Sequence, residues 1–332
     1  MATIKEVATA AGVSPSTVSR ILANDTWGKE ETRKRVLNAI KELQYNPNAL
    51  ARQFRTQETK TIIVIIPDLS NTIFHEITLG IEAEADAHNY KVLIVDTKRQ
   101  LSLESYYLNA IQQHEYDGVI SMDANIPRKL LEQFATKYPL VVALMNIPGS
   151  QIPTVRIDNI AATAAAMKHL IRLGHKSIAH ITSSSDLFAY KERLDTYREE
   201  LIKNNLSVNP QLIKAGEATI SGGFEMANQL IASGEKFTAI FAAGDTMAMG
   251  AISALRQKGI RVPEDVAVVG FDDLEVSSYY NPPLTTIRQP KYKIGQYAFS
   301  KLLSIMKEEK VTEPVDILPY ELVIRESCGH YL

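Results

Sequence analysis

The sequence predicts an α/β protein with an N-terminal three-helix, helix-turn-helix headpiece and a hinge helix, followed by two doubly wound parallel-sheet lobes. Three observations support this fold class. The first sixty residues have the apolar spacing of short helices separated by a tight turn. From Thr61 onward, short continuous apolar runs alternate with amphipathic stretches, as in parallel sheets covered by helices on both faces. This alternation restarts once, at SIAHIT, which indicates a second sheet.

Length and charge support a small basic module on a larger acidic body. A chain of 332 residues is too long for a single core, since domains of about 150 residues are usual. Residues 1–60 hold ten Lys/Arg and six Asp/Glu (10 − 6 = +4), and the remainder holds 26 and 32 (26 − 32 = −6). Because lysine and arginine release counterions from phosphate, the basic module is where a nucleic acid would bind. Chance variation along the chain explains an excess of this size almost as well.

Composition excludes several classes of protein. With 45% hydrophobic and 22% charged residues, the chain is typical of globular proteins. The single cysteine, Cys328, excludes a disulfide framework and a cysteine metal site within one chain. The N-terminus lacks the apolar core of a signal peptide, and no stretch approaches the roughly 18 apolar residues that span a bilayer. We therefore expect a cytoplasmic protein without a cofactor or metal.

The first helix is expected over residues 4–10. Thr3 followed by Glu6 is a capping-box pattern, which satisfies the free N–H groups at a helix start. Gly12 and Val13 then form a turn. The apolar residues that recur at helical spacing are Ile4, Val7, Ala8 and Ala11.

The second helix, residues 15–22, is the expected recognition helix. Ser14 is its N-cap and Pro15 its first residue. Its buried side is predicted to hold Val18, Ile21 and Leu22. Short side chains on the exposed side let the helix approach base edges closely, and one long arginine can reach a guanine or a phosphate. These exposed residues are Ser16, Thr17, Ser19 and Arg20.

The third helix is expected over residues 30–43, with a basic and an apolar side. The solvent-facing side holds Arg33, Lys34 and Arg35. The buried side is predicted to hold Val36, Leu37, Ile40 and Leu43.

In the body, TIIVIIP, KVLIVDT, DGVISM and LVVALM predict the strands of the first sheet, and SIAHIT, FTAIFAAG and DVAVVGFDD those of the second. Ligands of such sheets bind beyond the carboxyl ends of the strands, so a two-lobed protein closes over its ligand in the cleft. The candidate ligand residues therefore follow the strands: Asp68, Ser70, Asn71, Phe74, Met122, Asp123, Asn146, Arg193, Gly244, Asp245, Asp272 and Asp273.

Enzyme motifs are absent from the sequence. There is no G-x-G-x-x-G loop, no Walker loop and no G-x-S-x-G elbow. His75-Glu76 lacks a second histidine at the zinc-protease spacing, where Leu79 stands. Asp272 and Asp273 are adjacent and cannot flank one glycosidic bond from two sides. The remaining alternatives are a DNA-binding regulator, acting as repressor or activator, and a solute-binding receptor without DNA function.

The string TIKEVATAAGVSPSTVSRILAND, followed by EETRKRVLNAIKELQYNPNALAR, closely resembles the headpiece of LacI/GalR repressors. The resemblance continues through IPTVRIDN, PPLTTIRQP and ELVIRES, and it covers essentially the whole chain. It implies a bacterial, nucleoid-associated transcriptional repressor whose operator affinity is modulated by a small-molecule effector bound between two lobes. It also implies a body like the periplasmic sugar-binding proteins, with chain crossovers near Asn159, Arg288 and Pro319.

The expected domains follow from the resemblance. Residues 1–46 are the headpiece, 47–60 the hinge helix and linker, and 61–332 the effector-binding and dimerisation domain. Lobe one takes about 61–158 and 289–319, and lobe two about 159–288 and 320–332. Since one helix-turn-helix reads only one half-site, a homodimer on near-palindromic double-stranded operator DNA is expected, with no membrane partner.

Two departures from the family pattern concern DNA contacts. Asn48 can cap a hinge helix that ends at Phe54, which stands where most relatives have a leucine wedge; Phe54 either inserts between base pairs or packs on the body. Lys29 replaces the usual serine cap and is free to contact phosphate. Beside it, Trp27 has either a packing or a DNA-backbone role. The expected DNA-binding residues are Thr3, Ser14, Pro15, Ser16, Thr17, Ser19, Arg20, Asn24, Trp27, Lys29, Arg33, Asn48, Ala51, Arg52 and Phe54.

The resemblance also carries over effector-binding positions. Carboxylates and an arginine fork suit vicinal hydroxyls, and an aromatic suits a ring face. Asp245 is more readily explained as an N-cap and buried hydrogen-bond hub, and Phe74 equally well as core. The expected residues are Ser70, Asn71, Ile73, Phe74, Asp123, Asn146, Arg193, Asp245 and Asp272. TIIVIIPD and PPLTTIRQPKYKIG are most similar to nucleoside-responsive members of the family, so nucleosides and free sugars stand as even alternatives, ahead of phosphorylated metabolites.

Overall fold

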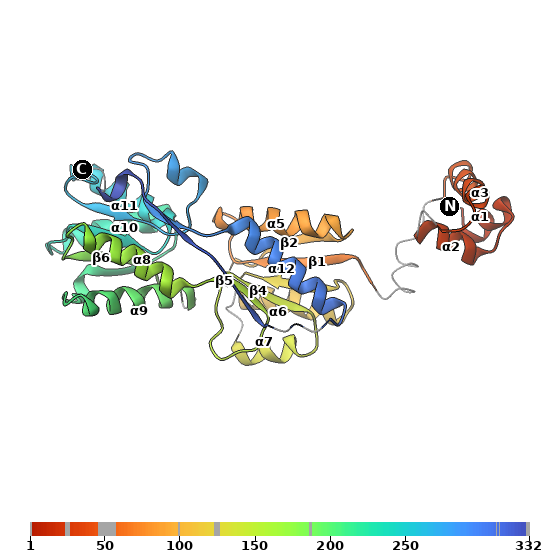
Figure 1. Cartoon of the computed structure of the whole chain (residues 1–332), viewed down its shortest axis with the longest axis horizontal. Helices are drawn as coiled ribbons and strands as arrows, with labels where there is room; N and C mark the ends of the chain where they lie inside the picture. The colour runs from red at the N-terminus through yellow and green to blue at the C-terminus, as the bar shows by residue number, and fades with distance from the viewer. Residues whose placement is uncertain are drawn as a thin grey trace. The chain divides into compact units, whose positions relative to one another are not determined.

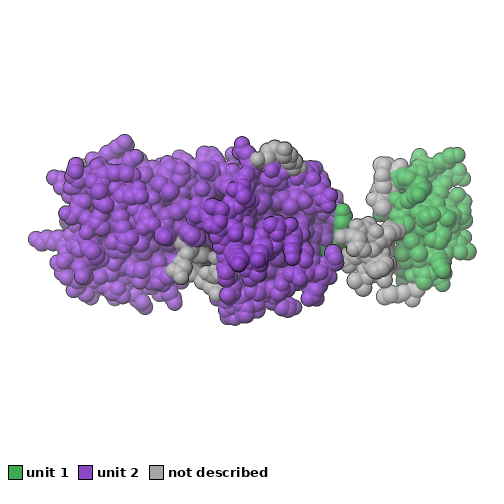
Figure 2. Space-filling view, turned by 90° about the horizontal axis from the view of Figure 1, so that it is seen from below, with its two compact units in different colours: residues 1–59 green, residues 60–332 purple. Residues whose placement is uncertain are grey.

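The computed structural model describes residues 2–23, 27–45, 58–98, 100–122, 127–185, 188–309, 311 and 313–329. The chain divides into two compact units, Met1–Thr59 and Lys60–Leu332, which are coloured separately in Figure 2. Several predicted site residues lie outside the described ranges, and their roles stay predictions: Asn24, Asn48, Ala51, Arg52, Phe54 and Asp123.

Unit 1 contains three described helices, α1 (Ile4–Ala11), α2 (Pro15–Ala23) and α3 (Glu30–Glu42), seen in Figure 1. The predicted capping box is present, because the Thr3 amide donates to Glu6 Oε2 at 2.6 Å and the Glu6 amide donates to Thr3 Oγ1 at 3.4 Å. Helix α1 ends at Gly12, whose φ of +64° suits glycine. The Thr17 amide donates to Ser14 Oγ at 3.2 Å, so Ser14 caps α2 as predicted.

The core of unit 1 is smaller than the sequence suggested. It consists of Val7, Ala8, Ala11, Val18, Ile21, Val36 and Ala39. Three leucines assigned to the buried side are instead exposed: Leu22 at 37%, Leu37 at 42% and Leu43 at 38%. The prediction for these three was wrong, because a three-helix unit has little interior and covers only a narrow stripe of each helix.

Unit 2 begins with a six-stranded sheet, which we call lobe one with its helices. Its strand order is β11-β5-β4-β3-β1-β2, and every pairing is parallel. The strands are β1 (Thr61–Ile66), β2 (Lys91–Asp96), β3 (Gly118–Ser121), β4 (Leu140–Ala143), β5 (Thr154–Ile157) and β11 (Val315–Leu318). The helices are α5 (Ile73–Ala87), α6 (Leu101–Gln112), α7 (Arg128–Ala135) and α12 (Lys291–Met306).

The second sheet, which we call lobe two with its helices, has four parallel strands in the order β7-β6-β8-β9. They are β6 (Ile178–Ser183), β7 (Ile213–Gly216), β8 (Ala239–Ala242) and β9 (Ala267–Val269). An antiparallel pair, β10 (Thr286–Arg288) and β12 (Glu321–Val323), accompanies it. The helices are α8 (Asn159–Arg172), α9 (Phe188–Lys203), α10 (Ile220–Ala232) and α11 (Asp245–Gln257), with short 3-10 turns η1 (Pro210–Leu212), η2 (Glu275–Ser278) and η3 (Glu326–Cys328).

Helices cover both faces of each sheet, as the continuous apolar strands predict (Figure 1). Along β1, alternate side chains enter different cores. Ile62 and Val64 pack with α5 and α12, whereas Ile63 and Ile65 pack with α6 and α7. Both faces of β1 are therefore buried. The doubly wound fold class is confirmed.

In each lobe one helix pair approaches closely through glycine. A Cβ at Gly80 of α5 would lie 2.1 Å from the Tyr292 carbonyl oxygen of α12. In lobe two, a Cβ at Gly250 of α11 would lie 2.1 Å from the Ile220 carbonyl oxygen of α10. Only glycine permits such close contact between helix backbones.

Strand β2 departs from the expected burial. The run KVLIVD reads as a buried strand, but Leu93 is 42% and Ile94 37% exposed. Strand β2 is the edge of the six-stranded sheet, so among the described residues no further strand of this sheet lies beside these side chains. In the described part of the chain, no helix has the length and apolar character needed to cross a bilayer.

Candidate functional sites

The first candidate site is the outer surface of α2. Ser14, Ser16 and Arg20 are exposed, and their neighbour Val18 is fully buried, so the helix is anchored on one side and open on the other. The Ser14 hydroxyl lies 2.8 Å from that of Ser16 and 2.9 Å from that of Thr17. The surface is thus short, polar and hydrogen-bonding, with Arg20 as its one long donor.

One basic and one aromatic side chain meet beside this surface. The guanidinium carbon of Arg20 lies 5.3 Å from the ring centroid of Trp27. Trp27 is partly buried and packs against the unit 1 core. Sequence left its role open between packing and a DNA contact, and the packing role is present.

The start of α3 supplies further cations. Lys29 is the N-cap residue of α3, and its side chain makes no capping bond. This lysine is exposed. Lys34 pairs with Glu30 at 3.0 Å on the helix surface. Arg33 is half-buried. Thr3, also predicted to contact DNA, is exposed and serves as the α1 cap.

The second candidate site lies at the carboxyl ends of the unit 2 strands. A cavity of 410 Å³ opens there between Asp68, which follows β1 of lobe one, and the residues that end β6 and β7 in lobe two. Its lobe-two wall is made of small and hydroxylated residues and one carboxylate: Ser183, Ser184, Ser185, Gly216, Glu217, Ala218 and Thr219. Among the described residues, no lysine or arginine lines this cavity. It therefore suits a hydroxylated ligand better than an anion.

Arg193, on α9, is 5% exposed and held in place by lobe two. Its Nε and Nη2 donate to Asn159 Oδ1 at 3.3 and 3.1 Å, and Nη1 donates to the Ala243 carbonyl at 2.5 Å. The guanidinium also stacks on Phe271, at 3.6 Å from the ring centroid. The arginine fork is pre-oriented before any ligand binds, which reduces the ordering cost of recognition.

Asp272 faces Arg193, with its Oδ1 3.8 Å from Arg193 Nη2. The same oxygen accepts a hydrogen bond from Gln289 Nε2 at 2.7 Å. Asp272 has a φ of +115°, a conformation that L-residues rarely adopt, and the Lys291 ammonium bonds its carbonyl at 3.0 Å. Strained backbone held by its surroundings is typical of binding sites. Burial raises the pKa of the Asp272 carboxyl, against the opposing effect of the Arg193 charge.

Asp245 is a hydrogen-bond hub, as one of the two predicted readings holds. Its Oδ2 accepts from the Leu274 amide at 2.9 Å and the Ser277 hydroxyl at 2.6 Å, and its Oδ1 accepts from the Thr286 hydroxyl at 2.6 Å. Asp245 was also predicted to be the N-cap of its helix, and this was wrong. It is the first residue of α11, and Gly244 is the N-cap. Burial, and secondarily the nearby Asp272 charge, raise the pKa of Asp245 to about 7.

A bridge joins the two lobes at this site. Asn146, which follows β4 in lobe one, donates from Nδ2 to Glu192 Oε1 at 3.0 Å. The other Glu192 oxygen accepts from Asn159 Nδ2 at 3.1 Å, and Asn159 in turn holds Arg193. Asn146 and Arg193 are therefore linked through Glu192 and Asn159, neither of which was predicted to bind the effector.

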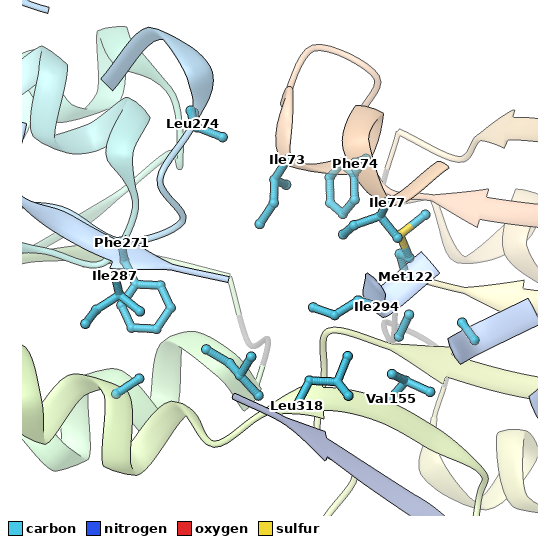
Figure 3. Close-up of a cluster of buried hydrophobic side chains, with 14 of the residues drawn as sticks. Ile73, Phe74, Ile77, Met122, Val155, Phe271, Leu274, Ile287, Ile294 and Leu318 are labelled. Atoms are coloured by element: carbon cyan, nitrogen blue, oxygen red, sulfur yellow. The ribbon is translucent and has the colours of Figure 1, made fainter. Parts of the chain in front are cut away.

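The start of α5 forms the apolar part of the site. Ile73 is 6% and Phe74 9% exposed, and both belong to a cluster that includes Phe271, Leu274 and Ile287 of lobe two (Figure 3). Phe74 is therefore a core residue, which is one of the two roles that the sequence left open. The Asn71 side chain accepts from the Ile73 amide at 3.2 Å and the Ser70 amide donates to Asp68 at 2.8 Å, so this loop is shaped by its own polar groups.

Sequence reasoning missed several site residues. Glu192, Asn159, Phe271, Gln289 and Lys291 all contact Arg193, Asp272 or their partners. Only adjacency to a predicted residue could have drawn attention to Glu192 and Phe271. Gln289 precedes α12 and Lys291 is its first residue. No local sequence pattern distinguishes these two residues from ordinary surface positions. Asp273, a strand-end candidate, instead pairs with Arg288 at 2.6 Å and Arg325 at 2.7 Å.

Residues 3–48 match the bacterial regulatory proteins of the lacI family, and residues 167–328 match the periplasmic binding protein-like domain. The HTH-type transcriptional repressor CytR of Escherichia coli K12 is 36% identical over 327 residues, covering 98% of this chain and 96% of that protein. A solved lac repressor dimer, bound to operator and the anti-inducer ONPF, superposes with a TM-score of 0.88 at 28% identity, covering 98% of this chain and 99% of that one. The regulator CelR in complex with cellobiose gives 0.74 at 30% identity, covering 98% and 100%.

Proposed function

We infer that this DNA-binding transcriptional regulator, which belongs to the lacI family of bacterial regulatory proteins, represses an operon under the control of a small hydroxylated effector. The observation that supports the effector most directly is the buried pair of Arg193 and Asp272 in lobe two. A cavity lined by hydroxyl groups opens at the ends of β6 and β7 of the same lobe. A receptor without DNA function, the alternative left open by the body, does not explain residues 3–48. The relatives are regulators and not enzymes.

The effector class follows from the charges of the cleft. Asp68 and Glu217 line the cavity, and Asp272 is a further buried carboxylate of lobe two. The donors of Arg193 are largely taken by Asn159 and Ala243. A phosphate would meet more carboxylates than free cations. A nucleoside or a free sugar offers hydroxyl groups that pair with carboxylate and hydroxyl oxygens. The relative solved with cellobiose is consistent with a sugar.

On DNA, Arg20 contacts a base edge and Lys29 a phosphate. Arg20 is the one long donor on the exposed side of α2, and Lys29 is exposed at the start of α3. Arg20→Ala should weaken the preferred operator by about 1–3 kcal/mol and relax the preference at one base pair. Lys29→Ala should weaken all sequences alike and flatten the salt dependence. Equal losses on operator and random DNA for Arg20→Ala would make Arg20 a phosphate contact.

The regulator acts as a homodimer. One recognition helix reads one half-site, so a near-palindromic operator requires two. Leu93 and Ile94 on β2 and Leu79 on α5 are exposed apolar side chains of lobe one, where a second protomer would bury them. Leu93→Glu should shift the sedimentation coefficient toward the monomer and weaken operator binding. The hinge wedge at Phe54 stays a prediction of the same scheme.

A thermal-shift screen with nucleosides, pentoses, hexoses and disaccharides tests the effector, since a ligand that binds the native state raises its melting temperature. The hit is then titrated against operator binding. We expect it to change operator affinity in the parent and not in Asp272→Asn. Deletion of the gene should raise expression of the controlled operon; a fall in expression would identify an activator.

A further inference from the structure

Arg20 and Trp27 form a cation–aromatic contact in unit 1. Arg20 is exposed near the end of α2, and Trp27 precedes α3. The guanidinium carbon lies 5.3 Å from the indole centroid, within the roughly 6 Å over which a cation is attracted to a ring face. The two side chains come from different segments, so this contact depends on the fold of the headpiece.

The two partners differ in how firmly they are held. Trp27 packs against the core cluster of unit 1, so its ring has a defined position. Arg20 is exposed, and a free arginine samples many rotamers before it binds. Tryptophan is the aromatic ring that attracts cations most strongly. An anchored indole therefore reduces the number of positions open to the Arg20 guanidinium.

We propose that Trp27 is a positioning residue for Arg20, which holds the guanidinium where it meets one base edge and so sets base preference without itself touching a base. The proposal rests on the assignment of Arg20 to a base in the preceding section. Positioning matters because a bidentate contact to a base requires the planar fork in one orientation. A ring that only filled space would instead support all DNA complexes equally.

The first test measures preference by selection. Full-length parent protein is used to select duplexes from a randomised library, which defines the preferred half-site. Trp27→Leu keeps apolar bulk and removes the ring, and Trp27→Phe keeps a weaker ring. We expect Trp27→Leu to lose about fivefold of the discrimination at the position that Arg20→Ala also affects, with Trp27→Phe in between. Affinity for random DNA should stay within about twofold.

Ile40→Ala is the matched control, since Ile40 also packs against the unit 1 core and is not part of the contact. It should weaken preferred and random DNA by the same factor. In an Arg20→Ala background, Trp27→Leu should cause no further loss of discrimination, because the residue it positions is gone.

The second test is spectroscopic and does not depend on folding of the Trp27 variants. Trp27 is the only tryptophan among the 332 residues, so all tryptophan emission reports this contact. Arg20→Ala should change the emission maximum and the accessibility of the indole to acrylamide in the free protein. Lys41→Ala, at an exposed position near the end of α3, should change neither.

The outcomes distinguish a failure of sequence-specific DNA binding from a failure of the positioning role of Trp27. If the parent selects no preferred sequence, the proposed sequence-specific binding to an operator is overturned. If the parent selects a half-site but Trp27→Leu keeps every preference, or if Arg20→Ala leaves the emission and quenching unchanged, the positioning role is overturned and Trp27 is a packing residue.

Discussion

The two units place their candidate sites in different ways. In unit 1, the residues of the proposed recognition surface lie on one helix and its cap, between Ser14 and Arg20. In unit 2, the residues of the cleft follow strands from Asp68 to Asp272, more than two hundred positions apart in the sequence. The first site needs only one helix to form and to be held by a small core. The second needs two sheets to be complete. Damage to unit 2 should therefore be larger and less local than damage to unit 1.

The largest expected effect is at Arg193. Arg193→Ala removes three hydrogen bonds, the positive charge that faces Asp272 and the donors to Asn159 Oδ1, all in a buried site. We expect the free energy of unfolding of unit 2 to fall by about 3–5 kcal/mol, with loss of the effector response. Urea unfolding followed by circular dichroism measures this. Operator binding at low temperature should persist, because unit 1 is unchanged; its complete loss would contradict the independence of the two units.

The next largest loss of stability is expected at Gly250, where α10 and α11 approach closely. Gly250→Ala forces a methyl group toward the Ile220 carbonyl, so α10 and α11 must separate. A loss of about 1–3 kcal/mol of unfolding free energy is expected. Ser253→Ala, at an exposed position of the same helix, should be neutral or slightly stabilising. Equal stability of the two variants would show that the close approach of α10 and α11 is unimportant.

The raised pKa of Asp245 predicts that the stability of unit 2 depends on pH. Its pKa in the folded protein is raised to about 7 from an ordinary value of 3.8, so the folded state binds this proton more tightly than the unfolded state. Its contribution is fully present below pH 3.8 and is lost as the pH rises toward 7. The loss is at most about 1.4 kcal/mol per pH unit. Denaturation midpoints between pH 4 and 8 should decline less steeply in Asp245→Asn than in the parent; parallel curves would refute this.

The smallest effect is at the start of α1. Thr3→Ala removes the capping box and should destabilise unit 1 by about 1 kcal/mol. Hydrogen exchange of the α1 amides should increase, while the amides of β1 and β3 stay protected. Thr9→Ala, which removes only a side-chain bond to the Lys5 carbonyl, is the control and should have little effect. A comparable loss of protection in unit 2 would mean that the units are coupled.

The sequence alone determined what depends on neighbours along the chain. Helix starts at Thr3 and Ser14 were predictable because capping bonds span only a few residues. The parallel sheets followed from continuous apolar strands, and the strand ends then indicated Arg193 and Asp272. The resemblance to a known family extended this reading over the whole chain.

Tertiary structure decided what depends on neighbours in space. The sequence could not show that Leu37 and Leu93 are exposed, because the size of a core and the edge of a sheet are not local properties. It also could not pair Glu192 with Asn146, since each carries a side chain that is ordinary at its own position. The contact of Arg20 with Trp27 is of the same kind. Periodicity reports which face of an element is apolar, and only the packed fold determines which polar groups meet.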